Sequence, residues 1–479
     1  MSQPVEKALE LADIAQHAWS EVVARRRLNK IGKVGNQIAQ DFQTYLPAIQ
    51  RPSSSDADKL ASEILPLAAA CHYTAQIGRR TLAPQYMPFR HAAWWMGRVS
   101  VRVTREPWGT VLILAPNNYP LLLPGVQIIQ AIAAGNAVVV KPAPDCGPVM
   151  EAFKLTLGRA GIPEDLLQIL PSTIEAGQEA MRHGVDKVIL TGSFHSGRAV
   201  LRELAETLTP ATMELSGCDA MFVLPNADVA IAVKSFLFAL ELNGGATCIA
   251  PRRVFLLRES AVSFIEELKQ KYSERSEPKS FPVPIGPLTA TIRCIEQALA
   301  KGAEIIVGEM PQASDKAMSP VILRGVDPTM EIARADLFAP VSSIFEFDDM
   351  SAALAADRKC PYSLGASVFG PQSYAEHWAE QVAAGCVVVN DAVVPTADPR
   401  APFGGWDQSG WGVTRGKEGL LEMTRVKTIC TRHGKWLPHL DPRLAQDTHA
   451  LGQILQLFYG SGLKTRWRAL VQLIATLRK

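Results

Sequence analysis

Short apolar runs alternate with segments of helical periodicity through the middle of the chain. Thr110–Leu114 and Ala137–Val140 carry no charged residue, which is typical of strands buried on both faces of a parallel sheet. The segments between such runs repeat their apolar residues at helical spacing, so the pattern predicts β–α–β units. The expected strands are Thr110–Leu114, Ala137–Val140, Leu167–Leu170 and Lys187–Leu190, and the expected helices are Pro124–Ala134, Val149–Ala160 and Glu175–Arg182.

The same alternation returns after about Gly217, so the chain is expected to hold two α/β halves of similar size. Residues 5–27 are expected to form a helix with Arg25 to Arg27 near its end, helical patterns continue to about Arg80, and Val99–Val103 alternates like a strand. The strands expected in the second half are Ala220–Leu224, Arg253–Leu257, Ala366–Phe369 and Val387–Asn390, and the helices are Ser263–Lys271, Ile292–Lys301 and Met350–Asp357.

Composition narrows the class of protein. The chain has 479 residues, which suggests two or three domains, and a net charge of +2, which gives no reason to expect a nucleic-acid partner. Its eight cysteines form no CxxC or Cys/His cluster, so no metal site is expected. The N-terminus lacks the pattern of a secretory signal, and the uncharged stretch 107–140 is broken by proline, glycine and asparagine. A cytoplasmic protein with reduced thiols is the natural expectation.

Two segments have features of phosphate binding, although no GxGxxG motif is present. Lys141 ends the strand Ala137–Val140, where α/β proteins bind ligands. Thr191–Gly197 follows another strand with small residues that let backbone N–H groups approach an anion. A plain turn remains an alternative for each segment.

Three residues are candidates for catalysis. Cys248 follows the pair Gly244–Gly245, and backbone dipoles there could give its thiol thiolate character. Its alternative is that of most free cysteines, a small buried hydrophobe. Glu214 could be an ordinary paired or solvated charge, and Asn118, which lies between prolines, an ordinary turn residue.

Taken together, these segments resemble the aldehyde dehydrogenase superfamily from about Val101 to Ile429. The motifs occur in the family's order and at similar spacings. They are Glu106-Pro107-Trp108-Gly109, Pro116-Asn117-Asn118-Tyr119-Pro120, Gly135-Asn136-Ala137 with Lys141-Pro142, Thr191-Gly192-Ser193, Glu214-Leu215-Ser216-Gly217, Gly245-Ala246-Thr247-Cys248, Leu337-Phe338-Ala339-Pro340-Val341, Gly385-Cys386-Val387-Val388-Val389-Asn390, and Pro402-Phe403-Gly404-Gly405 with Ser409-Gly410.

The resemblance implies a mechanism for oxidising an aldehyde to a carboxylic acid. Cys248 would attack the carbonyl, and the Asn118 amide with the Cys248 backbone N–H would stabilise the oxyanion. Glu214 would activate the water that hydrolyses the resulting thioester. The aldehyde itself is not identified.

The same resemblance implies an NAD(P) site. Lys141 would contact the adenosine ribose, Ser193 the pyrophosphate, and Phe338 the nicotinamide. Pro144 stands where the family often has glutamate, so NAD and NADP both remain open, with NAD slightly favoured. Asp336 replaces the glutamate that usually holds the nicotinamide ribose, so that contact is expected to be looser or water-mediated. The remaining expected cofactor-binding residues are Gly192, Gly197, Pro116 and Leu215.

The family fold implies two Rossmann-like domains, each a parallel sheet between helices, and a small β oligomerisation element. The NAD(P)-binding domain would comprise 1–95 and 109–216, the catalytic domain 217–423, and the bridging element 96–108 and 424–437. Such a bridge predicts a homodimer or a dimer of dimers.

Residues 438–479 form a tail that is expected to be helical. Its apolar face is Leu463, Trp467, Leu470, Val471, Ile474 and Leu477, and Lys464, Arg466, Arg468, Arg478 and Lys479 add positive charge. Contact with a membrane surface through 463–479, packing on the protein or a partner subunit, and capping of the substrate tunnel all remain open.

Two rival functions remain. One is a CoA-acylating aldehyde dehydrogenase or acyl reductase on the same fold, which Glu214 disfavours because only hydrolysis needs a base there. The other is a non-catalytic scaffold protein, which the combination of Asn118, Glu214 and Cys248 disfavours.

Overall fold

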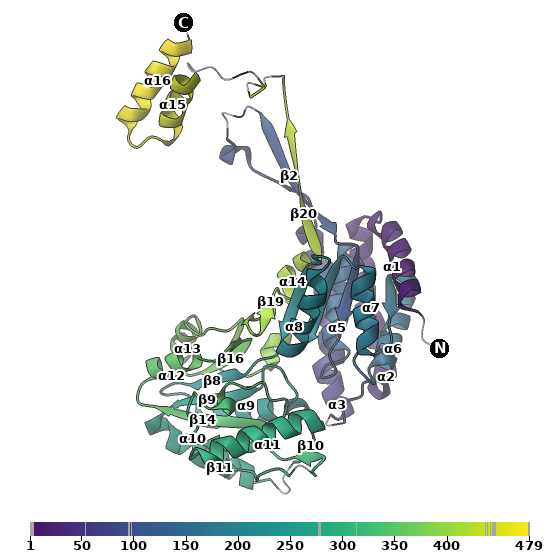
Figure 1. The fold of residues 1–479 in the computed structure, drawn as a ribbon, viewed down its shortest axis with the longest axis vertical. Helices are drawn as coiled ribbons and strands as arrows, with labels where there is room; N and C mark the ends of the chain where they lie inside the picture. Colours follow the sequence, from purple (N-terminus) through teal and green to yellow (C-terminus); the bar gives the residue numbers. More distant parts are fainter. Residues whose placement is uncertain are drawn as a thin grey trace. The chain divides into compact units, whose positions relative to one another are not determined.

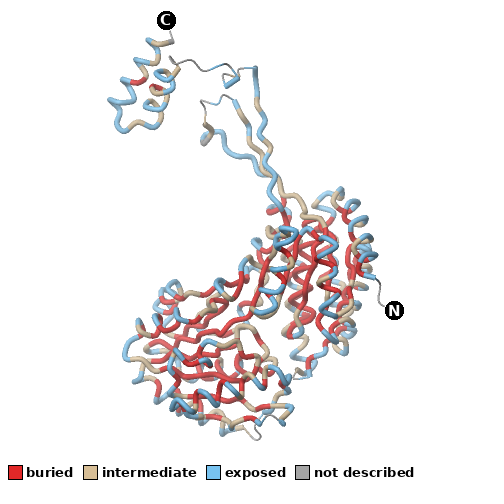
Figure 2. The backbone as a smooth tube through the Cα atoms, in the orientation of Figure 1, coloured by how far each residue is buried: buried red, intermediate tan, exposed pale blue. Residues whose placement is uncertain are grey.

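The computed structural model of the protein describes residues 4–52, 54–93, 96, 98–275, 279–312, 314–435, 437, 439–440, 442 and 447–477. The chain divides into two compact units (Figure 1). The first comprises Met1–Pro84 and Thr104–Lys427, and the second comprises Gln85–Val103 and Thr428–Lys479. Figure 2 shows that most of the buried backbone positions belong to the first unit.

A six-stranded sheet organises the first half of unit one. Its strand order is β19-β7-β6-β3-β4-β5, and all neighbours are parallel except β19 and β7. The strands are β3 (Thr110–Leu114), β4 (Ala137–Lys141), β5 (Leu167–Ile169), β6 (Lys187–Gly192), β7 (Ala211–Leu215) and β19 (Gly410–Trp411). The helices between them are α5 (Leu122–Ala134), α6 (Gly147–Arg159), α7 (Ile174–His183) and α8 (Phe194–Ala205). The first three match the predicted helices to within a few residues, whereas α8 was not predicted.

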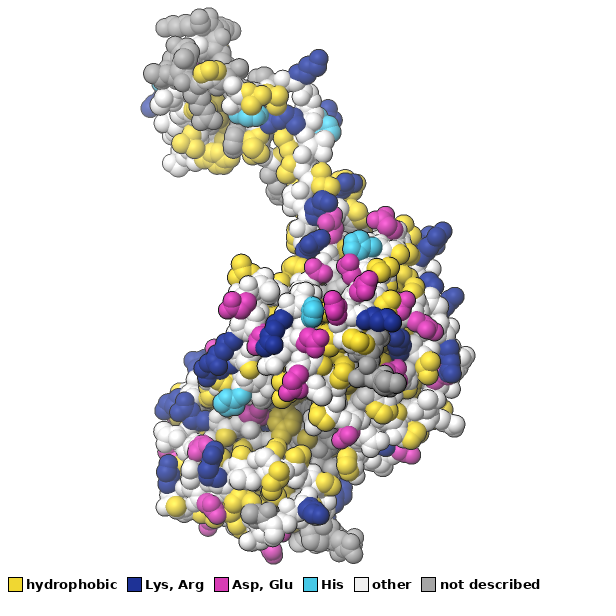
Figure 3. Space-filling view, turned by 45° about the vertical axis from the view of Figure 1, so that its right-hand side comes forward, with side chains coloured by type: hydrophobic (Ala, Val, Ile, Leu, Met, Phe, Trp, Pro, Cys, Tyr) yellow, Lys and Arg dark blue, Asp and Glu magenta, His cyan; other side chains and the backbone are white. Residues whose placement is uncertain are grey.

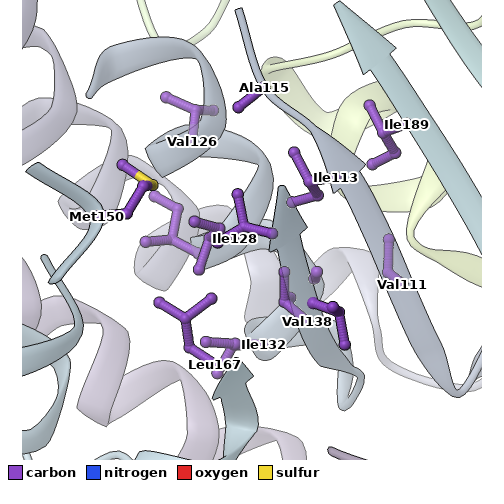
Figure 4. Close-up of a cluster of buried hydrophobic side chains, with 14 of the residues drawn as sticks. Val111, Ile113, Ala115, Val126, Ile128, Ile132, Val138, Met150, Leu167 and Ile189 are labelled. Atoms are coloured by element: carbon purple, nitrogen blue, oxygen red, sulfur yellow. The ribbon is translucent and has the colours of Figure 1, made fainter. Parts of the chain in front are cut away.

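The core of this half lies between the sheet and its helices. Every residue of β3 is buried, as expected for a strand covered on both faces. Figure 4 shows Ile128 and Ile132 of α5 beside Val138 of β4 and Leu167 of β5. The absence of charge in these strands is therefore explained by their burial.

A seven-stranded sheet organises the second half. Its order is β11-β13-β14-β9-β8-β16-β17, and only the β11–β13 pair is antiparallel. Stacked rings of Phe222, Phe255 and Phe345, with centroids 5.0 and 5.2 Å apart, fill part of its core. The strands are β8 (Asp219–Val223), β9 (Pro251–Leu257), β11 (Glu304–Val307), β13 (Val321–Arg324), β14 (Val341–Phe347), β16 (Gly365–Phe369) and β17 (Cys386–Val389), and the helices are α9 (Val229–Glu241), α10 (Arg258–Ser273), α11 (Ile285–Ala300), α12 (Met350–Asp357) and α13 (Gln372–Ala379).

The prediction of one helix over residues 5–27 is wrong. α1 (Val5–Ser20) ends before Glu21, and α2 (Ala24–Ala48) begins after Val23. The break lets Arg27 turn inward, where its Nε and Nη2 donate to the carbonyls of Ala133 and Ala134, each at 3.1 Å, at the end of α5. A cation there complements the negative end of the helix dipole.

Other elements of unit one are α3 (Asp56–Lys59), the π-helical turn η1 (Leu60–Ile64), α4 (Leu65–Thr81), β10 (Phe281–Pro282), β12 (Ala317–Met318), β15 (Tyr362–Ser363), β18 (Trp406–Asp407) and α14 (Gly416–Glu422).

The second unit contains the greater part of a small sheet and a pair of helices. β1 (Gln85–Tyr86) pairs with β2 (Val99–Pro107), and β20 (Thr424–Arg432) completes the order β1-β2-β20. α15 (Asp447–Tyr459) and α16 (Leu463–Leu477) pack against each other, so the tail contains a pair of helices within 447–477. Arg478 and Lys479 lie outside the described residues. In the described part of the chain, no helix has the length and apolar character needed to cross a membrane. Figure 3 shows acidic and basic side chains interspersed on the visible face of the first unit.

Candidate active site

Cys248 follows a loop whose backbone is left-handed over three residues. Asn243, Gly244 and Gly245 have φ of 54°, 64° and 79° after the end of α9. A Cβ at Gly245 would lie 2.4 Å from the backbone nitrogen of Pro340, so only glycine fits there. The pair of glycines before Cys248 is therefore required by the backbone path that presents the thiol.

Buried hydrogen bonds hold this loop in place. Arg252 donates to the carbonyls of Ala339, at 2.6 Å, and Gly245. The Asn243 Nδ2 donates to the carbonyl of Asn118 at 2.9 Å, which joins the loop to the segment after β3. The loop therefore has little freedom to move relative to its neighbours.

A buried ion pair also holds this loop in place. Arg51 Nη1 lies 3.1 Å from Glu63 Oε1, and both side chains are almost fully buried. Arg51 Nε donates to Asn243 Oδ1 at 3.0 Å, whereas Glu63 Oε2 accepts from the backbone N–H groups of Leu121, at 2.7 Å, and Leu122, at 3.2 Å. The pair thus links the beginning of α5 with the loop before Cys248.

The amide of Asn118 is oriented by two hydrogen bonds. Its Oδ1 accepts from the backbone N–H of Tyr119 at 3.0 Å, and its Nδ2 donates to the carbonyl of Ala246 at 3.1 Å. These partners fix which end of the amide is nitrogen. One amide hydrogen remains for a ligand, and Asn118 lines the same cavity as Cys248.

Glu214 lies on β7 and is 4% exposed. Its Oε2 accepts from the hydroxyls of Thr414, at 3.2 Å, and Thr191, at 3.4 Å, whereas its Oε1 is buried with no hydrogen-bond partner among the described residues. Burial raises the pKa of Glu214, and Arg415 lowers it less. A carboxylate with one oxygen free of hydrogen bonds can accept a proton from a water molecule.

The three candidate catalytic residues line one cavity of about 510 Å³. β3, β6 and β7 are parallel neighbours, so the segments that follow them meet at one edge of the sheet. The predicted cofactor residues that also line this cavity are Pro116, Gly192, Ser193, Leu215, Asp336 and Phe338.

Lys141 and Gly197 do not line the cavity. A Cβ at Gly197 would meet the Leu215 side chain at 2.7 Å, so this glycine permits close packing of α8 on β7. Lys141 is at the end of β4 as predicted, and burial lowers its pKa. Pro144 lines the cavity, and no carboxylate occupies that position to repel a phosphate.

The cavity offers groups that fit a dinucleotide. Ser193 is the N-cap of α8, so free backbone N–H groups and the helix dipole are available to a phosphate. Asp336 Oδ2 accepts from Ser216 Oγ, and its Oδ1 is buried without a partner among the described residues. An unpaired buried acceptor suits a ribose hydroxyl. Asp336, which departs from the family's glutamate, is therefore held through its other oxygen by Ser216.

A second, smaller cavity reaches Cys248 from a different set of residues. Its volume is about 220 Å³ and its wall is mainly apolar. Part of that wall is a γ-turn centred on Val393, with φ 61° and ψ −60° and a 2.6 Å hydrogen bond from Val394 N to the Ala392 carbonyl. This conformation is strained for a β-branched residue and is found mostly at functional sites. The apolar lining includes Tyr119, Leu122, Leu123, Phe238, Ile249 and Phe403.

Backbone dipoles are expected to give Cys248 thiolate character, whereas the burial and charges around the thiol act in the opposite direction. Burial raises the pKa of the Cys248 thiol, and the carboxylates of Glu214, Asp219 and Asp336 raise it further. Arg415 is the group that lowers it. Arg415 is not marked in the sequence as a site residue, because a cation in a glycine-rich segment is usually a solvated turn residue.

Comparisons with known proteins give one family. Residues 2–429 match the model of the aldehyde dehydrogenase family. The chain is 30% identical over 348 residues to the benzaldehyde dehydrogenase YfmT of Bacillus subtilis, covering 70% of this chain and 71% of the relative. It is 27% identical over 453 residues to a 4,4'-diapolycopene aldehyde oxidase of Methylomonas, covering 91% and 84%. The NAD+ complex of an aldehyde dehydrogenase from Bacillus cereus superposes with a TM-score of 0.81 at 25% identity, covering 89% and 88%.

Proposed function

This chain belongs to the aldehyde dehydrogenase family and oxidises an aldehyde with NAD or NADP as the acceptor, and we propose that Cys248 is the nucleophile of that reaction. The observation that carries the proposal is that Cys248, Asn118 and Glu214 line one cavity, although they lie far apart in the sequence.

The first step is addition of the Cys248 thiolate to the aldehyde carbon. The sulfur–carbon bond forms as the carbonyl π-electrons move to oxygen, which gives a thiohemiacetal oxyanion. The free amide hydrogen of Asn118 and the backbone N–H of Cys248 stabilise this charge. Burial disfavours the thiolate, so this step begins with loss of the thiol proton to water.

NAD(P)+ supplies the hydride acceptor when bound. Ser193 at the start of α8 would hold its phosphates, Asp336 Oδ1 a ribose hydroxyl, and Phe338 one face of the ring, with Pro116, Gly192 and Leu215 forming the walls. Lys141 and Gly197 would support the site from outside the cavity wall. Loss of hydride from the thiohemiacetal carbon leaves a thioester on Cys248.

Hydrolysis of the thioester completes the reaction. Glu214 Oε1 accepts a proton from water, the hydroxide adds to the thioester carbon, and the Cys248 thiolate leaves. The raised pKa of Glu214 makes it a stronger base than an exposed glutamate. This step distinguishes the reaction from acyl transfer to coenzyme A, which needs no water-activating base.

The second cavity supports an aldehyde with an apolar body. Its aromatic and aliphatic wall suits a ring or a hydrocarbon chain, with the carbonyl at Cys248. The names of two relatives, a benzaldehyde dehydrogenase and a diapolycopene aldehyde oxidase, describe substrates of this kind.

Cys248→Ala should abolish NAD(P)H formation from benzaldehyde, whereas Cys430→Ala, which removes an exposed cysteine of the other unit, should leave it unchanged. Glu214→Gln should keep a first burst of NAD(P)H and lose steady turnover, because only hydrolysis is blocked. Unchanged turnover in Cys248→Ala would refute the assignment. Coenzyme A-dependent formation of an acyl thioester would instead support the acylating rival.

We also propose the division into a NAD(P)-binding domain, a catalytic domain and a bridging element that the family implies, which the two separate large sheets support. A homodimer or a dimer of dimers is supported by β20, which is an edge strand in the described sheet. Contact of 463–477 with a membrane surface is supported by exposed Leu463, Trp467 and Val471 on α16, and a cytoplasmic location fits an enzyme that uses a soluble nicotinamide cofactor.

A further inference from the structure

Arg415 is the one cation among the described residues that line either cavity at Cys248. Its side chain is largely buried, with the residue 8% exposed. Nη1 donates to the Thr396 carbonyl, and the guanidinium lies 4.8 Å from the centroid of the Phe403 ring. None of the ion pairs found in the described part of the chain involves it, which is unusual for a buried arginine.

The backbone of Arg415 is in a region that glycine normally occupies. Its φ is 62° and its ψ is 177°. A side chain is costly in this conformation, and such outliers concentrate at functional sites. The neighbouring Thr414 hydroxyl donates to Glu214, so the strained position lies directly beside the candidate base. Since glycine would relieve the strain, the reason for an arginine here lies in its side chain.

The charge of Arg415 acts on acidic groups from three elements. Arg415 lowers the pKa of Glu214 on β7, of Cys248 after the glycine loop, and of Cys386 on β17, in each case against a larger rise caused by burial. Asp219 and Asp336 raise the pKa of the Cys248 thiol. Arg415 therefore opposes a set of groups that all disfavour negative charge at the thiol.

We propose that Arg415 supplies the fixed positive charge that balances the negative charge on Cys248 and Glu214 during turnover. It acts through these two residues and not on the substrate, so it is a positioning residue. The inference rests on the proposed roles of Cys248 and Glu214. Its guanidinium remains charged at every pH in the working range, which suits a permanent counter-charge.

Alkylation of Cys248 by iodoacetamide tests this directly, because only the thiolate reacts and neither aldehyde nor cofactor is needed. The rate at the Cys248 peptide is measured by mass spectrometry from about pH 7 to about pH 10. The proteins compared are wild type, Arg415→Met, Arg415→Gln, Arg415→Lys and the control Lys417→Met, which removes an exposed cation two residues away, in the first turn of α14. Exposed Cys430 is an internal control in every sample.

Loss of a nearby buried charge should raise the pKa of the thiol by about one unit. The thiolate fraction then falls about tenfold, and the greater nucleophilicity of a more basic thiolate recovers about threefold, so alkylation should slow about threefold to tenfold in Arg415→Met and Arg415→Gln. Arg415→Lys should stay within about twofold of wild type, and Lys417→Met and Cys430 should not change. Loss of the bulky side chain alone would open the cavity and speed the reaction.

Equal rates in wild type and both neutral variants would overturn the proposal, as would a slowing shared by Cys430. The pH profile of kcat/KM gives a second readout, in which the acid limb should move up by about one unit in the neutral variants and return in Arg415→Lys. A uniform loss of activity without movement of that limb would also overturn it. If Cys248→Ala retained turnover, the proposed function would fail, but the alkylation result would still decide the electrostatic role.

Discussion

Replacing Arg51 or Glu63 breaks a buried ion pair in two different ways. Glu63→Gln leaves the Arg51 guanidinium buried, and the amide nitrogen of glutamine must face either Nη1 or the two N–H groups at the start of α5. Arginine cannot lose its charge, so the full penalty for an unpaired buried ion, about 3 to 5 kcal/mol, should appear in the free energy of unfolding.

Arg51→Met should cost less, because Glu63 can bind a proton. Its pKa is already raised by burial, with Arg51 the main opposing influence, so the folded state of the variant holds a proton that the unfolded state releases. Stability of Arg51→Met therefore increases as the pH falls through the folded-state pKa, by about 1.4 kcal/mol per unit, until the unfolded carboxyl also protonates near about pH 4.3. The penalty should be complete at about pH 8 and clearly smaller at about pH 5.

The assay is urea unfolding of both single variants and the double variant, followed by tryptophan fluorescence and by far-ultraviolet circular dichroism. Coincident transitions are required before free energies are extracted. The double-mutant cycle should give a coupling energy of about 2 kcal/mol or more. Additive effects, or a cost of Arg51→Met that does not change with pH, would refute the reasoning. Arg51→Lys separates the two roles of Arg51, because it keeps the charge but loses the Nε–H that Asn243 accepts.

Gly245→Ala should lower the free energy of unfolding by about 2 kcal/mol or more, because the added Cβ meets the backbone of Pro340. The control Gly286→Ala, in open space on α11, should be neutral or stabilising by about 0.5 kcal/mol. Thermal melts compare the two variants, and equal effects would contradict this prediction. Pro144→Glu should raise KM for NADP at least about tenfold with little change in KM for NAD, since a carboxylate there repels a 2′-phosphate. Steady-state kinetics with both cofactors measures this, and an equal rise in KM for NAD and NADP would contradict it. The acid limb of kcat should lie above the pH of an ordinary glutamate, because the raised pKa of Glu214 keeps the base protonated to higher pH, and a limb near about pH 4.3 would count against Glu214 as the base.

The sequence was sufficient for β3 to β6 in the first sheet, for β8, β9, β16 and β17 in the second, and for the helices α5 to α7 and α10 to α12. It did not predict β7, β11, β13, β14, α8, α9 or α13. Runs such as Thr110–Leu114 lack charge because every residue is buried, so the pattern and its cause coincide. The helix expected over 5–27 fails because nothing local marks its break. There is no glycine or proline between Ser20 and Ala24, and the bend depends on contacts more than a hundred positions away, such as Trp19 Nε1 to the Ile132 carbonyl at 2.8 Å.

Some residues of the candidate site can likewise be identified from the sequence alone, and others cannot. Cys248, Glu214 and Asn118 belong to motifs that can be read along the chain. Arg415 and Arg51 do not, because their importance arises from partners brought together by folding, as when Arg51 reaches Asn243 from 192 positions away. A single sequence carries no mark of such contacts, whereas a buried charge in the structure identifies them.

The two cavities meet at Cys248 and have only Leu123 as a second common residue in their described linings. The residues that line one cavity can therefore change during evolution while those that line the other stay constant. Changes at Val393, Val394 or Phe238 would alter the room for the organic substrate without touching the groups around Ser193 and Asp336. Such modularity makes the preference for an aldehyde and the use of a dinucleotide separately evolvable, with a single sulfur atom as the point that both must preserve.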